Sequence, residues 1–160
     1  MTDSKHKVIL VADDSESDRD IIERALRKSR MHCTLKEVCD GEQLLMYLQR
    51  QPPFDDKQTY PWPDLVLLDI NMPRLNGKEA LRQLRQLDSC KLLPVVILTT
   101  SSRDKDVLES YQLGVNGYIT KPIESKDFIS AILQLESFWL GLAVRPPSRG
   151  DSYELPDNMG

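Results

Sequence analysis

The sequence is poor in cysteine, has no excess of basic residues and contains no long apolar run. Its three cysteines, Cys33, Cys39 and Cys90, are odd in number and lack metal-ligand spacing, which argues against a disulfide framework and a zinc site. With 21 basic against 25 acidic residues, the net charge of -4 gives no reason to expect direct nucleic-acid binding. The apolar run at 8–12 is too short for a signal peptide, and no run reaches the roughly 18 residues of a membrane span. We expect a cytoplasmic protein.

The length and composition fit one ordinary domain. The chain has 160 residues, of which 40% are apolar and 29% are charged, as is typical of soluble globular proteins. Proline, glycine, serine and aspartate dominate from residue 145 onward. We therefore expect a domain over residues 1–144 and a flexible tail over 145–160. No attached output module is expected, so a signal would pass through surface contacts.

Short apolar runs alternate with stretches in which apolar residues recur three and four positions apart. These two patterns predict strands and helices respectively. The expected strands are 8–12, 33–38, 65–68, 94–98 and 117–119. Five strands alternating with five helices predict an α/β fold, a doubly wound parallel sheet covered on both faces. Asp40 with Gln43 predicts a capping box, Asn76 with Gly77 a turn before a helix, and Ser125 an N-cap.

Polar side chains follow four of the expected strands. Asp13 and Asp14 come after the first strand, Asp69 after the third, Thr99 at the end of the fourth and Lys121 after the fifth. Because ligand sites of open parallel sheets lie beyond the carboxyl ends of the strands, these side chains are expected to converge. Three neighbouring carboxylates would repel one another, and a hard divalent cation with oxygen ligands relieves that repulsion. The sequence therefore predicts a Mg²⁺ site.

Each of these residues also has an ordinary structural explanation. Asp13 and Asp14 could cap the next helix, Asp69 could belong to a turn, Thr99 could satisfy backbone groups, and Lys121 could be solvated. Their joint occurrence at four strand ends favours a functional site.

Four segments in the same order carry a specific resemblance. They are VILVADD at 8–14, LVLLDINMP at 65–73, PVVILTT at 94–100 and GYITKP at 117–122. Together they resemble the receiver domains of two-component response regulators, and the resemblance covers residues 7–140. It implies a flavodoxin-like fold with strand order 2-1-3-4-5.

The resemblance also implies the chemistry of the site. Asp69 would be the phosphoacceptor, taking a phosphoryl group from a phosphohistidine of a sensor kinase. Mg²⁺ would be held by Asp14, by Asp69 and by the main-chain carbonyl of Asn71, with Asp13 acting through a bound water. The protein would be a signalling phosphoacceptor rather than a turnover enzyme, with self-catalysed phosphotransfer and slow autodephosphorylation.

Further residue roles follow from the same resemblance. Thr99 and Lys121 would contact the phosphoryl oxygens, and the Lys121-Pro122 peptide bond would be cis. Asn71 and Thr100 would flank the path of the hydrolytic water, and β-branched Thr100 would hinder it.

The expected output is a change of surface. Tyr118 matches the family's switch aromatic, whose ring would move from an exposed to a buried position and alter the face made by the fourth helix, fifth strand and fifth helix. Past the expected end of the last helix, Phe138, Trp139 and Leu140 predict a dimerisation or docking surface, or apolar side chains that fold back under the tail. These residues and the proline-rich insertion are similar to small cyanobacterial regulators that partner phytochrome histidine kinases, which implies such a kinase partner and a homodimer.

Other classes of protein share part of this pattern. A Mg²⁺-dependent phosphohydrolase with an aspartyl-phosphate intermediate needs similar groups, but it typically carries Asp-x-Asp after the first strand, where this chain has Asp13-Asp14-Ser15. A flavodoxin-like cofactor binder would need a phosphate-binding loop there, and two acids repel phosphate. A docking module that works without phosphorylation stays open as an alternative.

Overall fold

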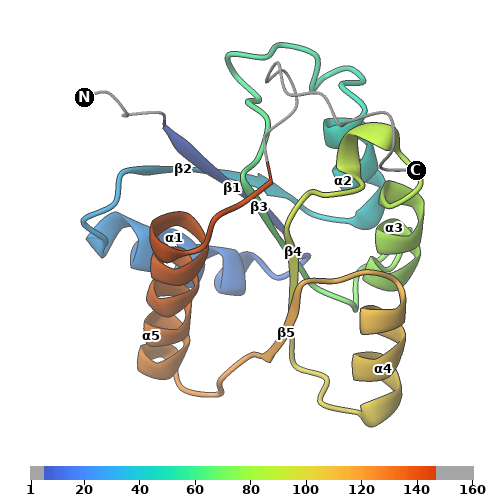
Figure 1. The fold of residues 1–160 in the computed structure, drawn as a ribbon. Helices are drawn as coiled ribbons and strands as arrows, with labels where there is room; N and C mark the ends of the chain where they lie inside the picture. The colour runs from blue at the N-terminus through green and yellow to red at the C-terminus, as the bar shows by residue number, and fades with distance from the viewer. Residues whose placement is uncertain (1–5, 147–160) are drawn as a thin grey trace.

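The computed structural model describes residues 6–146, which form one parallel β-sheet covered by helices (Figure 1). The strand order is β2-β1-β3-β4-β5, as the resemblance implied. The five strands are β1 (Lys7–Ala12), β2 (Cys33–Val38), β3 (Leu65–Leu68), β4 (Val95–Thr99) and β5 (Gly117–Thr120). Each lies within one residue of the strand predicted from the apolar runs.

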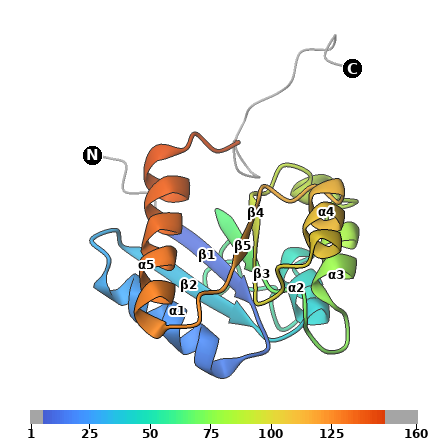
Figure 2. The same ribbon diagram turned by 90° about the horizontal axis from the view of Figure 1, so that it is seen from below.

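The helices lie on both faces of the sheet, with α1 (Glu16–Lys28) and α5 (Ser125–Glu136) on one side and α2 (Gly41–Leu48), α3 (Gly77–Leu84) and α4 (Asp104–Gln112) on the other (Figure 2). A short 3₁₀ turn, η1 (Asp88–Cys90), leads into β4. The predicted doubly wound α/β architecture is confirmed.

Burial on both faces explains why the strands read as continuous apolar runs. Every residue of β3 and β4 is buried. In β1, Ile9 and Val11 pack with α1 and α5, whereas Leu10 and Ala12 pack with α2 and α3. Alternate residues of a strand point to opposite faces, so one strand contributes to both halves of the core.

Local capping sets where two of the helices begin. Asp40 Oδ1 accepts a hydrogen bond from Gln43 N at 2.8 Å, and Asn76 Oδ1 accepts one from Glu79 N at 3.0 Å. The expectation that Ser125 caps α5 is wrong by one residue, because Ser125 is already the first residue of the helix and Glu124 takes the cap position.

The proline-rich insertion after α2 is a loop that folds back on the domain. Tyr47 Oη donates a hydrogen bond to the carbonyl of Pro61 at 2.6 Å, and the rings of Phe54 and Tyr60 lie 5.0 Å apart. Phe54 and Tyr47 are buried, so the insertion is anchored by its aromatic residues.

The chain after α5 continues as a π-helical turn, η2 (Ser137–Leu142). Leu140 is buried and Trp139 packs partly against the core, whereas Phe138 is half exposed. The apolar extension is therefore divided: Leu140 completes the core, contrary to its expected place in an interface, and Phe138 faces solvent. Arg145 pairs with Asp64 at 2.9 Å, so contact with the domain reaches the first residue of the expected tail.

Residues 147–160 of that expected tail lie outside the described residues. Within residues 6–146, no helix is long and apolar enough to cross a membrane.

Candidate functional site

The carboxyl ends of four strands deliver the predicted side chains to one edge of the sheet. The backbone ladder continues one residue past the strands: Asp13 N donates to Val38 O at 3.1 Å, and Lys121 N donates to Thr99 O at 2.7 Å. Asp69 N donates to Ala12 O at 3.0 Å. These bonds place the side chains after β1, β3 and β5 beside one another, as the sequence predicted.

Lys121 is the centre of this group. Its Nζ donates to Asp13 Oδ2 at 2.7 Å, to Asp18 Oδ2 at 2.8 Å and to Asp69 Oδ2 at 3.3 Å. Burial by itself lowers the pKa of the ammonium group, but the hydrogen bonds to Asp13 and Asp18 and the charge of Asp69 outweigh it and raise the pKa. Lys121 therefore stays charged at any physiological pH.

Asp18 is a member of this cluster that the sequence did not single out. It stands in the first turn of α1, which begins at the same edge of the sheet. An acidic residue in a first turn is ordinary on grounds of the helix dipole alone. The available signal was that α1 starts only three residues after Asp13, which places its first turn next to the strand ends.

The acidic side chains fit a divalent metal ion. One carboxylate oxygen from each of Asp13, Asp14 and Asp69 lies within 4.8 Å of the others; Asp13 and Asp69 are buried and Asp14 is exposed. Burial raises the pKa of Asp13, the hydrogen bond from Lys121 opposes this, and the charge of Asp69 adds to the rise. An all-oxygen donor set with repelling charges is what Mg²⁺ or Mn²⁺ binds.

Asp69 and Thr99 lie nearest to the expected chemistry, and their hydrogen bonding differs. Asp69 Oδ1 accepts a hydrogen bond from Asn71 N at 3.3 Å, while its Oδ2 faces Lys121. Thr99 is fully buried, and its Oγ1 has no hydrogen-bond partner among the described residues. A buried hydroxyl without a partner is uncommon, and an acceptor added at this edge would satisfy it.

A glycine lets α3 approach the backbone that follows β3. A Cβ on Gly77 would lie 2.1 Å from the carbonyl oxygen of Asp69, and Gly77 N donates to Ile70 O at 2.8 Å. The helix therefore packs directly against the backbone of Asp69, which only glycine permits.

The remaining predicted residues lie around this edge. Asn71 and Thr100 are exposed beside Asp69 and Thr99. Tyr118 is half-buried, and its Oη donates to the carbonyl of Ser101 at 2.9 Å. The expectation of a cis Lys121-Pro122 bond is wrong: the described part of the chain has its one cis peptide bond at Pro52-Pro53. Lys121 reaches the three carboxylates with the trans bond that is the default for proline.

Comparisons with known proteins agree with this geometry. The family model described as "Response regulator receiver domain" matches residues 9–133. Response regulator Rcp1 of Synechocystis sp. is 38% identical over 140 residues, which cover 88% of this chain and 93% of that protein.

Two solved structures are similar over nearly their whole length. The phosphorylated cyanobacterial phytochrome response regulator RcpA has a TM-score of 0.84 at 34% identity and covers 89% of this chain and 99% of its own. The Mn²⁺-bound form of Rcp1 has a TM-score of 0.81 at 38% identity, covering 88% and 99%. The chain belongs to the response regulator receiver domain family and is related to phytochrome response regulators.

Proposed function

We propose that this protein accepts a phosphoryl group from a phosphohistidine of a sensor histidine kinase onto Asp69. A carboxylate oxygen of Asp69 attacks phosphorus, the P–N bond breaks with its electron pair left on the imidazole nitrogen, and an acyl phosphate forms. The observation that carries the proposal is the contact of Lys121 Nζ with both Asp13 and Asp69 at an edge where the Thr99 hydroxyl has no partner among the described residues.

The residues around Asp69 have matching tasks. Lys121 is a fixed cation beside the atoms on which negative charge develops, and Thr99 is a free donor for a phosphoryl oxygen. Asp14, Asp69 and the main-chain carbonyl of Asn71 would hold Mg²⁺, with Asp13 acting through a water. When bound, the ion supplies charge neutralisation for the transfer.

The phosphorylated state should be long-lived enough to carry a signal. Thr100 is exposed next to Thr99, and Asn71 is exposed two residues after Asp69. A water approaching the acyl phosphate would pass between them, and the β-branched side chain of Thr100 narrows that path. Slow autodephosphorylation, rather than turnover of a substrate, is therefore the expected behaviour.

The output would be a change at the face made by α4, β5 and α5. Tyr118 lies in β5, and α4 carries two exposed apolar side chains, Leu108 and Tyr111. Phe138, in η2 directly after α5, is also exposed. Exposed apolar side chains favour a protein partner, and we propose that phosphorylation promotes a homodimer through the face made by α4, β5 and α5. We propose that the domain that accepts the phosphoryl group and makes this contact is residues 1–144.

The kinase partner is inferred from the relatives. The solved structure of RcpA is that of a phytochrome response regulator, and it is similar over 89% of this chain. We propose that the partner here is likewise a phytochrome histidine kinase.

One experiment tests the acceptor and the output together. Wild type and Asp69→Asn are treated with beryllofluoride and Mg²⁺, and their mass is followed by size exclusion. Dimerisation of wild type but not of Asp69→Asn supports both parts of the proposal. Monomers throughout refute the dimer, and labelling by acetyl phosphate that persists in Asp69→Ala refutes Asp69 as the acceptor.

A further inference from the structure

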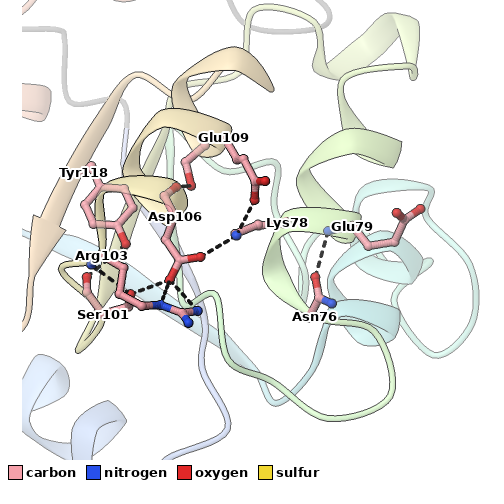
Figure 3. Close-up of polar contacts among 9 residues, drawn as sticks. Asn76, Lys78, Glu79, Ser101, Arg103, Asp106, Glu109 and Tyr118 are labelled. Carbon is pink, nitrogen blue, oxygen red and sulfur yellow. Dashed lines mark hydrogen bonds and ion pairs between the residues drawn. The ribbon is translucent and has the colours of Figure 1, made fainter.

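A buried carboxylate outside the acidic site joins three elements of the fold. Asp106 in α4 is 1% exposed. Its Oδ1 accepts a hydrogen bond from Lys78 Nζ of α3, and its Oδ2 accepts bonds from Ser101 Oγ and, at 3.0 Å, from Arg103 Nε (Figure 3). One side chain thus ties α3 to the β4–α4 loop and to the start of α4.

Lys78 and Asp106 form a strong ion pair. The hydrogen bond from Lys78 holds the pKa of Asp106 well below its usual range, and the bonds to Asp106 and to Glu109, at 2.6 Å, raise the pKa of Lys78. Both groups stay charged around neutral pH. Removing the lysine would leave a buried carboxylate with its main counter-charge gone, which the surrounding loop must then rearrange to accommodate.

Ser101 connects this pair to the proposed switch residue. While its hydroxyl donates to Asp106, its backbone carbonyl accepts the hydrogen bond from Tyr118 Oη. Tyr118 pairs with Ile97 across the sheet, and Thr99 lies on the same face as Ile97, two residues further along β4. Ser101 follows Thr99 by two residues, so a shift of Thr99 toward Asp69 would reach the carbonyl that Tyr118 binds through this short stretch of backbone.

We propose that Lys78 and Asp106 are positioning residues that hold the Ser101 carbonyl where the Tyr118 hydroxyl can bind it. The ion pair between α3 and α4 thereby favours the arrangement of the Tyr118 ring in which its hydroxyl is bonded to the Ser101 carbonyl, called the inward arrangement below. The effect of this ion pair on phosphorylation rests on the function proposed above. Its effect on the position of the Tyr118 ring does not.

The consequence for signalling follows from linkage. If the inward arrangement is the one that accepts the phosphoryl group best, then the apparent affinity for a phosphoryl analogue scales with the fraction of molecules in that arrangement. Loss of the ion pair lowers this fraction and weakens binding of the analogue, although neither Lys78 nor Asp106 touches Asp69.

The structure offers matched variants for the test. Lys78→Met removes the cation, and Lys78→Arg keeps it. Arg82→Met is the control, because Arg82 is a cation of the same helix whose ion pair, with Glu79, stays within α3. Lys78 and Arg82 both line a groove of about 370 Å³ between α3 and α4, so each new side chain has room.

The first readout is the ring itself, without metal or phosphoryl analogue. Fluorine NMR of protein labelled with fluorotyrosine reports Tyr118, whose resonance is assigned from Tyr118→Phe. We expect a shifted or exchange-broadened Tyr118 signal in Lys78→Met and a wild-type signal in Lys78→Arg and Arg82→Met. Ser101→Ala, which keeps the ion pair but cuts its link to the loop, should shift the signal in the same direction and serves if Lys78→Met fails to fold.

The second readout is beryllofluoride binding at saturating Mg²⁺. We expect Lys78→Met to bind about fivefold more weakly than wild type, at the lower end of typical coupling between sites. A Tyr118 signal unchanged in both Lys78→Met and Ser101→Ala overturns the proposal, and so does tighter beryllofluoride binding. If wild type itself fails to bind beryllofluoride, the proposed function fails while the fluorine signal still decides the role of the ion pair.

Discussion

Replacing Lys121 by methionine tests the electrostatics on which the acidic site depends. In the wild-type protein, one ammonium group contacts three carboxylates, and two of them, on Asp13 and Asp69, are buried. The variant keeps these acids close together without the cation. Removing one partner of a buried ion pair costs about 3–5 kcal/mol. The lower end of this range applies here, because Asp18 is partly exposed and Asp14 is exposed to water.

The expected loss of about 3 kcal/mol corresponds to a fall of roughly 6–12 °C in the melting temperature for a domain of this size. Thermal unfolding in EDTA measures it. Lys126→Met, at an exposed position of α5, is the control and should change stability by less than about 0.5 kcal/mol. Mg²⁺ should restore more stability to Lys121→Met than it adds to wild type, because the ion replaces the missing positive charge.

The pH dependence has a definite sign. Burial already raises the pKa of Asp13 and Lys121 opposes the rise, so removal of Lys121 raises this pKa further. A carboxyl group whose pKa is higher in the folded state stabilises the fold when protonated, and this stability is lost as pH rises through the folded pKa. The deficit of Lys121→Met should therefore shrink as pH is lowered from 7 toward about 4. A deficit that is absent in EDTA, or that grows on acidification, would refute the reasoning.

Three further substitutions probe separate parts of the structure. Thr99→Val removes a buried hydroxyl that has no partner within residues 6–146, so stability should rise by about 1 kcal/mol while beryllofluoride binding weakens, measured by denaturation and titration. Gly77→Ala places a Cβ 2.1 Å from the Asp69 carbonyl and should abolish acetyl phosphate labelling and lower the melting temperature. Arg85→Met removes hydrogen bonds to the carbonyls of Leu93, at 2.8 Å, and Gly114, at 2.7 Å, and should cost about 3 kcal/mol in urea unfolding.

Each of these has a clear contrary result. A destabilised Thr99→Val would mean that the hydroxyl is satisfied in the native protein. A normally labelled Gly77→Ala would mean that α3 can move away from the Asp69 backbone without cost. An unchanged Arg85→Met would mean that the carbonyl partners of Arg85 are equally well solvated without it.

The strands and the location of the site could be predicted because their signals are local. A central parallel strand is buried on both faces, so β3 and β4 read as uninterrupted apolar runs, and the polar residue that follows each run marks the functional edge. The order of the four motifs then identifies the receiver family.

The contacts that the sequence did not predict join segments that are far apart in the chain. The short distance in sequence from Asp13 to α1 places Asp18 near the strand ends, but it does not indicate that the carboxylate binds Lys121, which lies 103 residues away in the sequence. The pairing of Lys78 with Asp106 spans 28 residues and two helices, and neither residue is unusual in its own helix. The apolar residues after α5 form the same sequence pattern whether their side chains point into the core or toward solvent. In the structure Leu140 is buried and Phe138 is exposed.

The sequence by itself determined the alternation of strands and helices, the family, and the edge at which acids, a threonine and a lysine meet, because each follows from periodicity along the chain or from short ordered motifs. Only the tertiary structure decided which carboxylates Lys121 binds, that the Thr99 hydroxyl lacks a partner among the described residues, and that α3 is tied to the β4–α4 loop through Asp106. Those properties depend on side-chain positions to within an ångström across elements far apart in the chain, which residue order alone does not specify.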